Sequence, residues 1–228
     1  MKALIFDLDD TLWPIAPVIM AAEAKLHEWM AQEAPAVVAR YSIEDLRVRR
    51  QALVATDARF SYDLWALRHT LLVQVFEEFG IDAAKAEPAM QVFARERSRV
   101  TLFADVMPAL NQLRGRFVLA SISNGFADLQ AIGLDQHFSV SLAAHQFGCA
   151  KPDPRIFHAM LERLQLEPAE CMYIGDDLRI DVQGAQQVGM RAAWINRRAT
   201  TPDDGALAQL KPDYVLNDLH DLLHILRD

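Results

Sequence analysis

Short apolar segments that end abruptly in polar residues place the strongest constraint on the fold of this chain. The first, Ala3-Leu-Ile-Phe6, stops at the carboxylate of Asp7. An unbroken apolar run of this length is typical of a strand buried on both faces of a parallel sheet. Similar patterns predict strands at 117–122, 138–142, 171–174, 191–195 and 214–216. Helical segments separate most of these runs, so the sequence predicts an α/β fold with a doubly wound parallel sheet.

A long helical segment interrupts this alternation after the first strand. Between residues 16 and 99, apolar residues recur at three-to-four spacing, for example at Leu64, Leu67 and Leu71. Breakers such as Pro35 divide the segment and predict helices near 17–34, 42–55, 62–79 and 86–99. We therefore expect an α/β core domain made of residues 1–15 and 102–228, with an all-helical domain, residues 16–101, inserted into it.

Composition and charge exclude several classes of protein. With 52% hydrophobic and 24% charged residues, the chain has ordinary globular usage. Its net charge of −8 opposes binding to nucleic acid. The apolar run before Asp7 is too short for a signal peptide and no segment reaches membrane-spanning length, so we expect a cytoplasmic protein with no membrane partner. Cys149 and Cys171 lack the spacing of a zinc site and are expected to be free thiols, and the oligomeric state is left open.

Polar residues follow four of the predicted strands or open the next helix. In a doubly wound sheet the carboxyl ends of the strands share one edge, where Asp7, Ser123, Lys151 and Asp176 would converge. Asp7 and Asp9 could then divide the work of phosphoryl transfer, one as nucleophile and the other handling protons. The alternative is that these carboxylates merely form an acidic turn.

A second acidic loop, Gly175-Asp176-Asp177 followed by Asp181, would bring more negative charge to the same edge. Such carboxylates repel one another unless a cation lies among them. We predict a Mg²⁺ site formed by Asp7, Asp176 and the backbone carbonyl of Asp9, with Asp177 and Asp181 outside the direct ligands.

Two further loops supply groups for phosphate oxygens. In Ser123-Asn124-Gly125, the hydroxyl and the loop amides can donate hydrogen bonds, and the glycine permits close backbone approach. Lys151-Pro-Asp-Pro154 opens a helix with its lysine able to reach the site. Taken singly, the first is often just a turn and the second an ordinary surface lysine.

In order, these four loops resemble the four motifs of the haloacid dehalogenase (HAD) superfamily of aspartate-nucleophile phosphatases. The resemblance spans almost the whole chain. It implies Asp7 as nucleophile, Asp9 as general acid and then base, and Ser123 with Lys151 as stabilisers of the phosphoryl group. It further implies Asp7 and Asp176 as magnesium ligands, Thr11 as support for the loop, and a small-molecule phosphate ester as substrate.

The helical insertion resembles the type-one cap of this superfamily, which closes over the active site and confers specificity. Motifs such as Asp7-Leu-Asp-Asp-Thr-Leu-Trp13 and Trp194-Ile-Asn196 are similar to a bacterial subgroup that hydrolyses flavin mononucleotide (FMN) or 5-amino-6-(5-phospho-D-ribitylamino)uracil. His145 and Gln146 depart from the Ser-Glu pair that many members of the superfamily carry there.

Trp65, Arg68 and His69 are candidates for substrate contacts in the cap, since an aromatic ring and an arginine can bind a planar ring. The simpler interpretation makes Trp65 part of the cap core and Arg68 part of a solvated face. For Arg47, Arg49 and Arg50 we expect an exposed basic face.

Three other functions stay open at this point. A 2-haloacid dehalogenase also uses an aspartate nucleophile, but it needs neither a metal nor an acid at the second position, so Asp9 and Asp176 argue against it. A phosphomutase would pass the phosphoryl group to a sugar hydroxyl with the same loops. A non-catalytic binding module on the same scaffold is the third, although every expected catalytic position is occupied.

Overall fold

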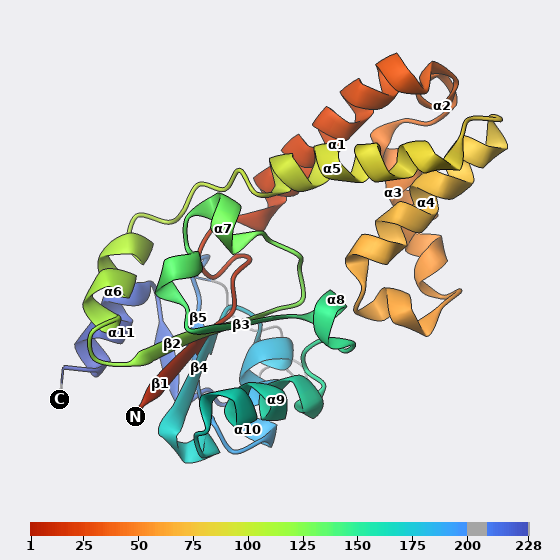
Figure 1. Cartoon of the computed structure of the whole chain (residues 1–228). Helices are drawn as coiled ribbons and strands as arrows, with labels where there is room; N and C mark the ends of the chain where they lie inside the picture. Colours follow the sequence, from red (N-terminus) through yellow and green to blue (C-terminus); the bar gives the residue numbers. More distant parts are fainter. Residues whose placement is uncertain (200–208, 228) are drawn as a thin grey trace. The chain divides into compact units, whose positions relative to one another are not determined.

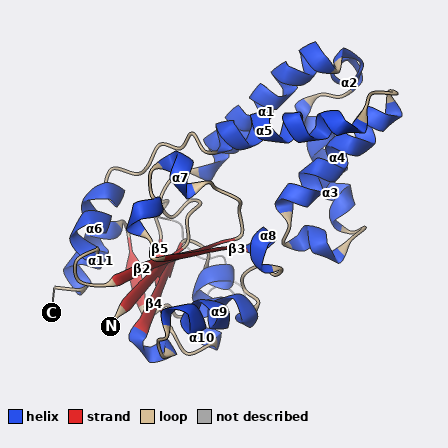
Figure 2. Cartoon of the chain, in the orientation of Figure 1, coloured by secondary structure: helices blue, strands red, loops and turns tan. Residues whose placement is uncertain are grey.

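The computed structural model, which describes residues 1–199 and 209–227, contains a six-stranded parallel sheet. The strand order is β3-β2-β1-β4-β5-β6, and helices cover both faces (Figures 1 and 2). This confirms the predicted α/β fold with a doubly wound parallel sheet. Residues 200–208 and 228, which fall within the predicted core domain, lie outside the described residues.

The strands lie within two residues of their predicted bounds. They are β1 (Ala3–Phe6), β2 (Val118–Ser123), β3 (Val140–Ala143), β4 (Cys171–Gly175), β5 (Arg191–Ile195) and β6 (Tyr214–Leu216). The helices beside them are α6 (Val106–Leu113), α8 (Ala144–Phe147), α9 (Pro154–Leu164), α10 (Gly184–Gln187) and α11 (Leu219–Ile225). After β4 the chain forms a π-helical segment, η5 (Leu178–Gln183), that continues into α10.

Contacts between backbone positions separate the chain into two compact units. The core unit comprises residues 1–14, 101–125 and 133–228, and the helical unit comprises 15–100 and 126–132. The helical unit contains α1 (Ile15–Glu33), α2 (Pro35–Arg40), α3 (Ile43–Val54), α4 (Leu64–Glu78), α5 (Ala86–Arg97) and α7 (Leu129–Ile132). The short α2 was not predicted, because Pro35 is the first residue of a helix and not the end of one.

The helical unit has its own apolar core, with Phe76, Met90 and Phe93 buried between its helices. It also includes residues 126–132, which the predicted boundaries assign to the core domain. The reason is aromatic packing: the Phe126 ring lies 5.5 Å from that of Trp65 and 6.0 Å from that of Phe93. Across residues 1–199 and 209–227, no helix is long and apolar enough to cross a bilayer.

The sheet register sets the position of the polar loops in the core unit. Phe6 pairs with Ser121 of β2 and with Ile174 of β4, so the three neighbouring strands end at one edge. The amide of Asp7 donates to the carbonyl of Ile174 (2.8 Å), which extends the pairing by one residue. Asp7 therefore lies beside the loops that follow β2 and β4.

A buried ion pair between Arg197 and Asp105 links segments of the core unit that are far apart in the sequence. The guanidinium of Arg197 donates to both carboxylate oxygens of Asp105 (3.0 and 2.9 Å) and to the carbonyl of Thr11 (2.9 Å), and the Leu219 amide donates to Asp105 (2.8 Å). Burial by itself would raise the pKa of the Asp105 carboxyl. The hydrogen bonds from Arg197 and from the Leu219 amide lower it more, so the pKa lies below its usual value.

Replacing Arg197 with methionine should destabilise the protein by about 3 kcal/mol, because it leaves the Asp105 carboxylate buried without its cation. Urea unfolding at neutral pH measures the change in the free energy of unfolding.

This destabilisation should depend on pH. Since the pKa of Asp105 is lowered in the folded state, the stabilisation by the ion pair is lost as the pH falls through that pKa. The difference in the free energy of unfolding between variant and wild type should therefore become smaller in acid. The matched control is Arg198→Met, whose exposed ion pair with Asp10 should matter little. Equal losses in the two variants would contradict the assignment.

Candidate active site

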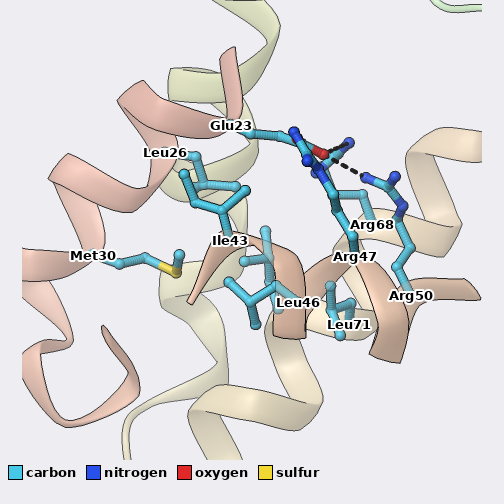
Figure 3. Close-up of a pocket in the computed structure, with 10 residues that line it drawn as sticks. Glu23, Leu26, Met30, Ile43, Leu46, Arg47, Arg50, Arg68 and Leu71 are labelled. Atoms are coloured by element: carbon cyan, nitrogen blue, oxygen red, sulfur yellow. Dashed lines mark hydrogen bonds and ion pairs between the residues drawn. The ribbon is translucent and has the colours of Figure 1, made fainter. Parts of the chain in front are cut away.

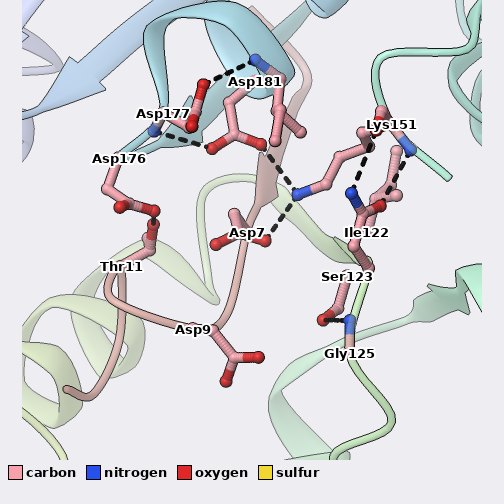
Figure 4. Close-up of polar contacts among 12 residues, drawn as sticks. Asp7, Asp9, Thr11, Ile122, Ser123, Gly125, Lys151, Asp176, Asp177 and Asp181 are labelled. Atoms are coloured by element: carbon pink, nitrogen blue, oxygen red, sulfur yellow. Dashed lines mark hydrogen bonds and ion pairs between the residues drawn. The ribbon is translucent and has the colours of Figure 1, made fainter. Parts of the chain in front are cut away.

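A buried lysine lies at the centre of the site. The Lys151 ammonium donates to Asp7 Oδ1 (2.5 Å), Asp181 Oδ1 (2.8 Å) and the Tyr173 hydroxyl (2.8 Å). Asp7 and Asp181 converge on it from β1 and from the helix after β4 (Figure 4). Tyr173 in turn donates to the carbonyl of Ile122 (3.1 Å), so the hydroxyl both accepts and donates. The Lys151 ammonium therefore links the Asp7 loop, its own loop and the second acidic loop.

The loop after β2 positions this lysine. Asn124 accepts a hydrogen bond from the Lys151 amide (2.8 Å) and donates to the Lys151 carbonyl (3.0 Å). Beside it, the Ser123 hydroxyl is buried and accepts from the Gly125 amide (3.0 Å). The tripeptide is thus more than a turn: Asn124 holds the backbone of the lysine loop, and Ser123 has its hydroxyl at the same edge of the sheet.

Asp176 is held from two sides. Its carboxylate accepts from the Thr11 hydroxyl (3.3 Å), and its carbonyl accepts from the Trp194 indole (2.7 Å). Burial, followed by the charges of Asp181 and Asp10, raises the pKa of Asp176 to about 7. Thr11 thus connects the first acidic loop to the second, and the Asp176 carboxylate is poorly compensated in the protein alone.

The second acidic loop is folded by its own side chains. Asp177 caps the following helix by accepting from the amides of Arg179 and Ile180 (both 2.8 Å), and its own amide donates to Asp181 Oδ2 (3.1 Å). Asp181 is thereby fixed between the loop backbone and the buried ammonium of Lys151. Asp177 acts here on the loop, and Asp181 is the carboxylate that reaches the cluster.

Gly175 makes room for this arrangement, since a β-carbon placed there would overlap the carboxyl group of Asp181. Gly175→Ala should therefore push Asp181 off Lys151 and lower the free energy of unfolding by about 1–3 kcal/mol. Chemical denaturation tests this. The control is Gly115→Ala, because nothing lies within 4 Å of a β-carbon at Gly115. The explanation fails if both alanines have the same effect.

Three carboxylates can hold a cation together. Asp7, Asp176 and Asp181 each place an oxygen within 4.8 Å of the others. With all three ionised and Lys151 as the buried cation among them, the group carries an excess of negative charge. Burial accordingly raises the pKa of Asp7 well above its usual value, with Lys151 opposing the shift. Burial by itself would lower the pKa of Lys151. The negative charges of Asp181 and Asp7 raise it by more, so the pKa lies well above its usual value and the lysine stays charged. Hard oxygen ligands with excess negative charge fit a divalent cation such as Mg²⁺.

Asp9 lies apart from this cluster. Its carboxylate points away from Asp7 and Lys151 (Figure 4) and accepts a hydrogen bond from the Trp13 indole (2.9 Å). The next residue, Asp10, has a left-handed backbone (φ 57°), which turns the chain. The Asp7 and Asp9 carboxylates therefore point in different directions, although the two residues are only two positions apart.

A cavity of about 300 Å³ lies within the core unit, with Asp176 among its lining residues. Asp10, Asp176, Asn196 and Arg198 contribute its polar lining. Arg198 pairs with Asp10 at 3.0 Å. The Asp176 carboxylate therefore borders both the cluster and a space large enough for several waters.

The three candidate cap residues belong to the helical unit. Trp65 is half-buried and packs edge-on against Phe126, as expected for a core residue. Arg68 is buried and pairs with Glu23, so its interpretation as part of a solvated face is wrong. His69 is partly exposed on the same helix. Trp65 and Arg68 are linked through two aromatic rings, since Trp65 packs on Phe126, Phe126 on Phe93, and the Arg68 guanidinium lies over Phe93.

Sequence reasoning missed several residues of the core site. From the sequence, Tyr173 is treated only as part of an apolar strand and Trp13 and Trp194 only as parts of motifs, and Arg197 is not identified. A buried tyrosine or tryptophan usually finds a partner for its polar atom, and that rule was the available signal. The partners themselves are far apart in sequence and follow only from the sheet.

Comparison with known proteins agrees with this geometry. A family model for haloacid dehalogenase-like hydrolases matches residues 1–189. The chain is 33% identical over 213 residues to the 5-amino-6-(5-phospho-D-ribitylamino)uracil phosphatase YigB of Escherichia coli, covering 92% of this chain and 87% of that protein. It is 32% identical over 247 residues to a phosphoserine phosphatase of Thermus thermophilus, covering 97% and 98%.

Among solved structures, a 2-haloacid dehalogenase from Pseudomonas syringae superposes with a TM-score of 0.92 at 36% identity, covering 99% of this chain and 98% of the other. A HAD phosphatase from Thermococcus onnurineus gives a TM-score of 0.72 at 28% identity, covering 100% and 98%. The resemblance inferred from the four loops is thus confirmed. The chain belongs to the haloacid dehalogenase-like hydrolase family.

Proposed function

We propose that this chain is a Mg²⁺-dependent phosphatase that hydrolyses small-molecule phosphate monoesters through a phosphoaspartyl intermediate. The observation that carries the proposal is the buried cluster of Asp7, Lys151 and Asp181 with Asp176 beside it. It combines a carboxylate nucleophile, a fixed positive charge and a set of cation ligands at one sheet edge. Phosphoryl transfer needs these three components.

In the proposed reaction, a carboxylate oxygen of Asp7 attacks the phosphorus and the bond to the ester oxygen breaks. Asp9 gives its proton to the leaving alkoxide, which departs as an alcohol. Asp9 then takes a proton from water, whose oxygen attacks the phosphorus and releases Asp7 and inorganic phosphate. Lys151 and Ser123 stabilise the phosphoryl oxygens during both steps.

We propose Asp7, Asp176 and the carbonyl of Asp9 as the magnesium ligands, with Asp181 close enough to act directly or through water. A bound magnesium ion would neutralise the excess negative charge and polarise the phosphate. It would also keep Asp7 ionised against the effect of burial on its pKa.

Magnesium binding should be visible without turnover. In metal-free protein, Mg²⁺ at 100 times its Kd should stabilise the fold by about 2.7 kcal/mol, which raises Tm by about 5–10 °C. Asp176→Asn should remove most of this rise, whereas Asp128→Asn, which changes the turn that starts α7 and none of the grouped carboxylates, should leave it unchanged. Differential scanning calorimetry with Mg²⁺ and with Na⁺ at equal ionic strength measures both. A rise that survives in Asp176→Asn would argue against this ligand set.

For the substrate, we propose 5-amino-6-(5-phospho-D-ribitylamino)uracil or FMN. The support is the similarity to the Escherichia coli enzyme over most of both chains. The helical unit would act as a cap that selects the substrate, with Trp65, Arg68 and His69 as candidate contacts. Phosphate release from a panel containing these two compounds, phosphoserine and sugar phosphates tests the choice. Turnover of a generic aryl phosphate with no response to either compound would reject the substrate and keep the chemistry.

The similarity to a 2-haloacid dehalogenase makes that activity the second candidate. In a dehalogenase reaction Asp7 would attack the carbon that carries the halogen. That reaction needs neither Asp176 as a metal ligand nor Asp9 as a proton donor. Halide release from 2-chloropropionate in the presence of EDTA, with no phosphate release from any ester, would favour it over the phosphatase. A phosphomutase would instead give isomerised sugar phosphate without free phosphate.

A further inference from the structure

The Tyr173 side chain is fully buried in β4, and its hydroxyl contacts two groups whose hydrogen-bonding roles are fixed. The Lys151 ammonium, 2.8 Å away, can only donate, and the Ile122 carbonyl, 3.1 Å away, can only accept. The phenol therefore accepts one hydrogen bond and donates the other, which fixes the direction of its O–H bond.

The ring that carries this hydroxyl is held by aromatic packing. Phe157 of α9 lies edge-on to Tyr173, with the ring centroids 5.4 Å apart and the planes at 67°. Phe157 is itself buried, and α10 packs directly against it, since a β-carbon placed at Gly184 would lie 2.8 Å from its Cζ atom. A side chain packed this closely has little freedom to move, so the hydroxyl of Tyr173 has a fixed position.

This hydroxyl occupies one of the three N–H donors of Lys151. The described contacts assign the donors to three different oxygens, which belong to Asp7, Asp181 and Tyr173. The two carboxylates balance the charge of the ammonium. The phenol is neutral, so it contributes mainly to the direction in which the ammonium points.

The buried glutamate of the helical unit provides a contrast. Glu23 of α1 accepts hydrogen bonds from Arg47 (2.7 Å), Arg50 (3.1 Å) and Arg68 (3.5 Å), as Figure 3 shows. Arg47 and Arg50, expected on an exposed basic face, thus pair with a buried carboxylate. Each of these partners carries the opposite charge, so charge compensation alone accounts for the cluster. The neutral partner of Lys151 needs a different explanation.

The proposed reaction changes both charged partners of Lys151. When Asp7 attacks the phosphorus, its attacking oxygen becomes part of the acyl phosphate and the carboxylate loses its negative charge. Asp181 lies within reach of the proposed magnesium ion, which would compete with Lys151 for its oxygens. Tyr173 takes part in neither change. Among the three acceptors, its hydroxyl is therefore the one that stays the same before and after the phosphoryl group is transferred.

We propose that Tyr173 is a positioning residue that holds the Lys151 ammonium in place while Asp7 carries the phosphoryl group. It acts through Lys151 and does not touch the substrate. This role rests on the proposed phosphatase function, since it concerns the step in which Asp7 is phosphorylated.

Tyr173→Phe tests the role, because it removes one oxygen and keeps the ring that packs on Phe157. In saturating Mg²⁺, kcat for p-nitrophenyl phosphate should fall about tenfold and KM should change less than about twofold, as for loss of a hydrogen bond to a charged group. The inhibition constant of orthovanadate, which mimics the five-coordinate phosphorus of the transition state, should rise by about the same factor as kcat falls. A merely structural role would lower the fraction of folded protein and leave this inhibition constant unchanged.

Two comparisons complete the experiment. Tyr41→Phe removes a hydroxyl that donates to Glu78 (2.6 Å) in the helical unit, and it should leave kcat, KM and orthovanadate inhibition at their wild-type values. Adding Tyr173→Phe to Lys151→Met should lower kcat no further, because a residue that acts through Lys151 has no effect once the ammonium is gone. Urea unfolding verifies that each variant is folded under the assay conditions.

Four results would overturn the proposal. They are an unchanged kcat in Tyr173→Phe, a fall in kcat without a rise in the inhibition constant of orthovanadate, an equal fall in Tyr41→Phe, and a further fall on the Lys151→Met background. None of them bears on the phosphatase function, which depends on the loss of activity in Asp7→Asn. A wild-type protein that releases no phosphate from any ester would overturn both.

Discussion

Asp7→Asn should abolish phosphate release, with kcat falling by about 10³-fold or more, because an amide oxygen cannot act as the nucleophile that forms the acyl phosphate. The fold should survive, since asparagine has the same shape and removes a buried charge whose pKa is already raised by burial. Release of p-nitrophenol from p-nitrophenyl phosphate in Mg²⁺ measures the activity, and urea unfolding measures stability.

The matched control for this variant is Asp10→Asn, three residues along the same loop. Asp10 pairs with Arg198 at the edge of the cavity, and its side chain is not one of the grouped cation ligands. We expect Asp10→Asn to keep most of the activity. If Asp7→Asn hydrolyses the aryl phosphate at the wild-type rate, the phosphoaspartyl mechanism is wrong.

Lys151→Met should have the largest combined effect on activity and stability. It removes the ammonium from between Asp7 and Asp181 and leaves two carboxylates buried together, at a cost of about 3–5 kcal/mol in the free energy of unfolding. Loss of the positive charge at the phosphoryl oxygens should lower kcat by about 10²–10³-fold. Urea unfolding and initial rates in saturating Mg²⁺ test the two parts separately.

A surface lysine provides the comparison. Lys2 forms an ion pair with Glu170 but is largely exposed, so Lys2→Met should leave both stability and rate near the wild-type values. If Lys151→Met were as stable as Lys2→Met, the contacts of the Lys151 ammonium would not be contributing to the fold. If it were less stable but fully active, Lys151 would have a structural role only.

Local pattern was enough to predict most of the core unit. The strand Ala3–Phe6 lies where its apolar run lies, because a strand buried on both faces needs every residue to be apolar. The strands Arg191–Ile195 and Tyr214–Leu216 also have their predicted bounds. The polar residues that follow them then share one edge, since the strands are parallel. Convergence of Asp7, Lys151 and the second acidic loop could therefore be predicted from the sequence.

Partner choice within the site could not be predicted in this way. Nothing local shows that Asn124 holds the backbone of Lys151, or that the Tyr173 hydroxyl joins the cluster. In the helical unit, spacing identifies a helix face but not what lies against it, so the pairing of Arg68 with Glu23 across 45 positions was missed. Residues 126–132 belong to that unit because of aromatic contacts, and the local sequence around them contains no pattern that predicts this.

The central lysine contacts have a consequence for the way the protein gains activity as it folds. Lys151 is 144 positions from Asp7 and 30 from Asp181, so the cluster forms only when β1 has paired with β4 and the lysine loop has docked. Contacts of such long sequence separation form slowly, because the entropy of closing a long loop opposes them. Recovery of catalysis after dilution from urea should therefore follow completion of the sheet, and a nascent chain that has released only its first half would carry Asp7 without any of its partners.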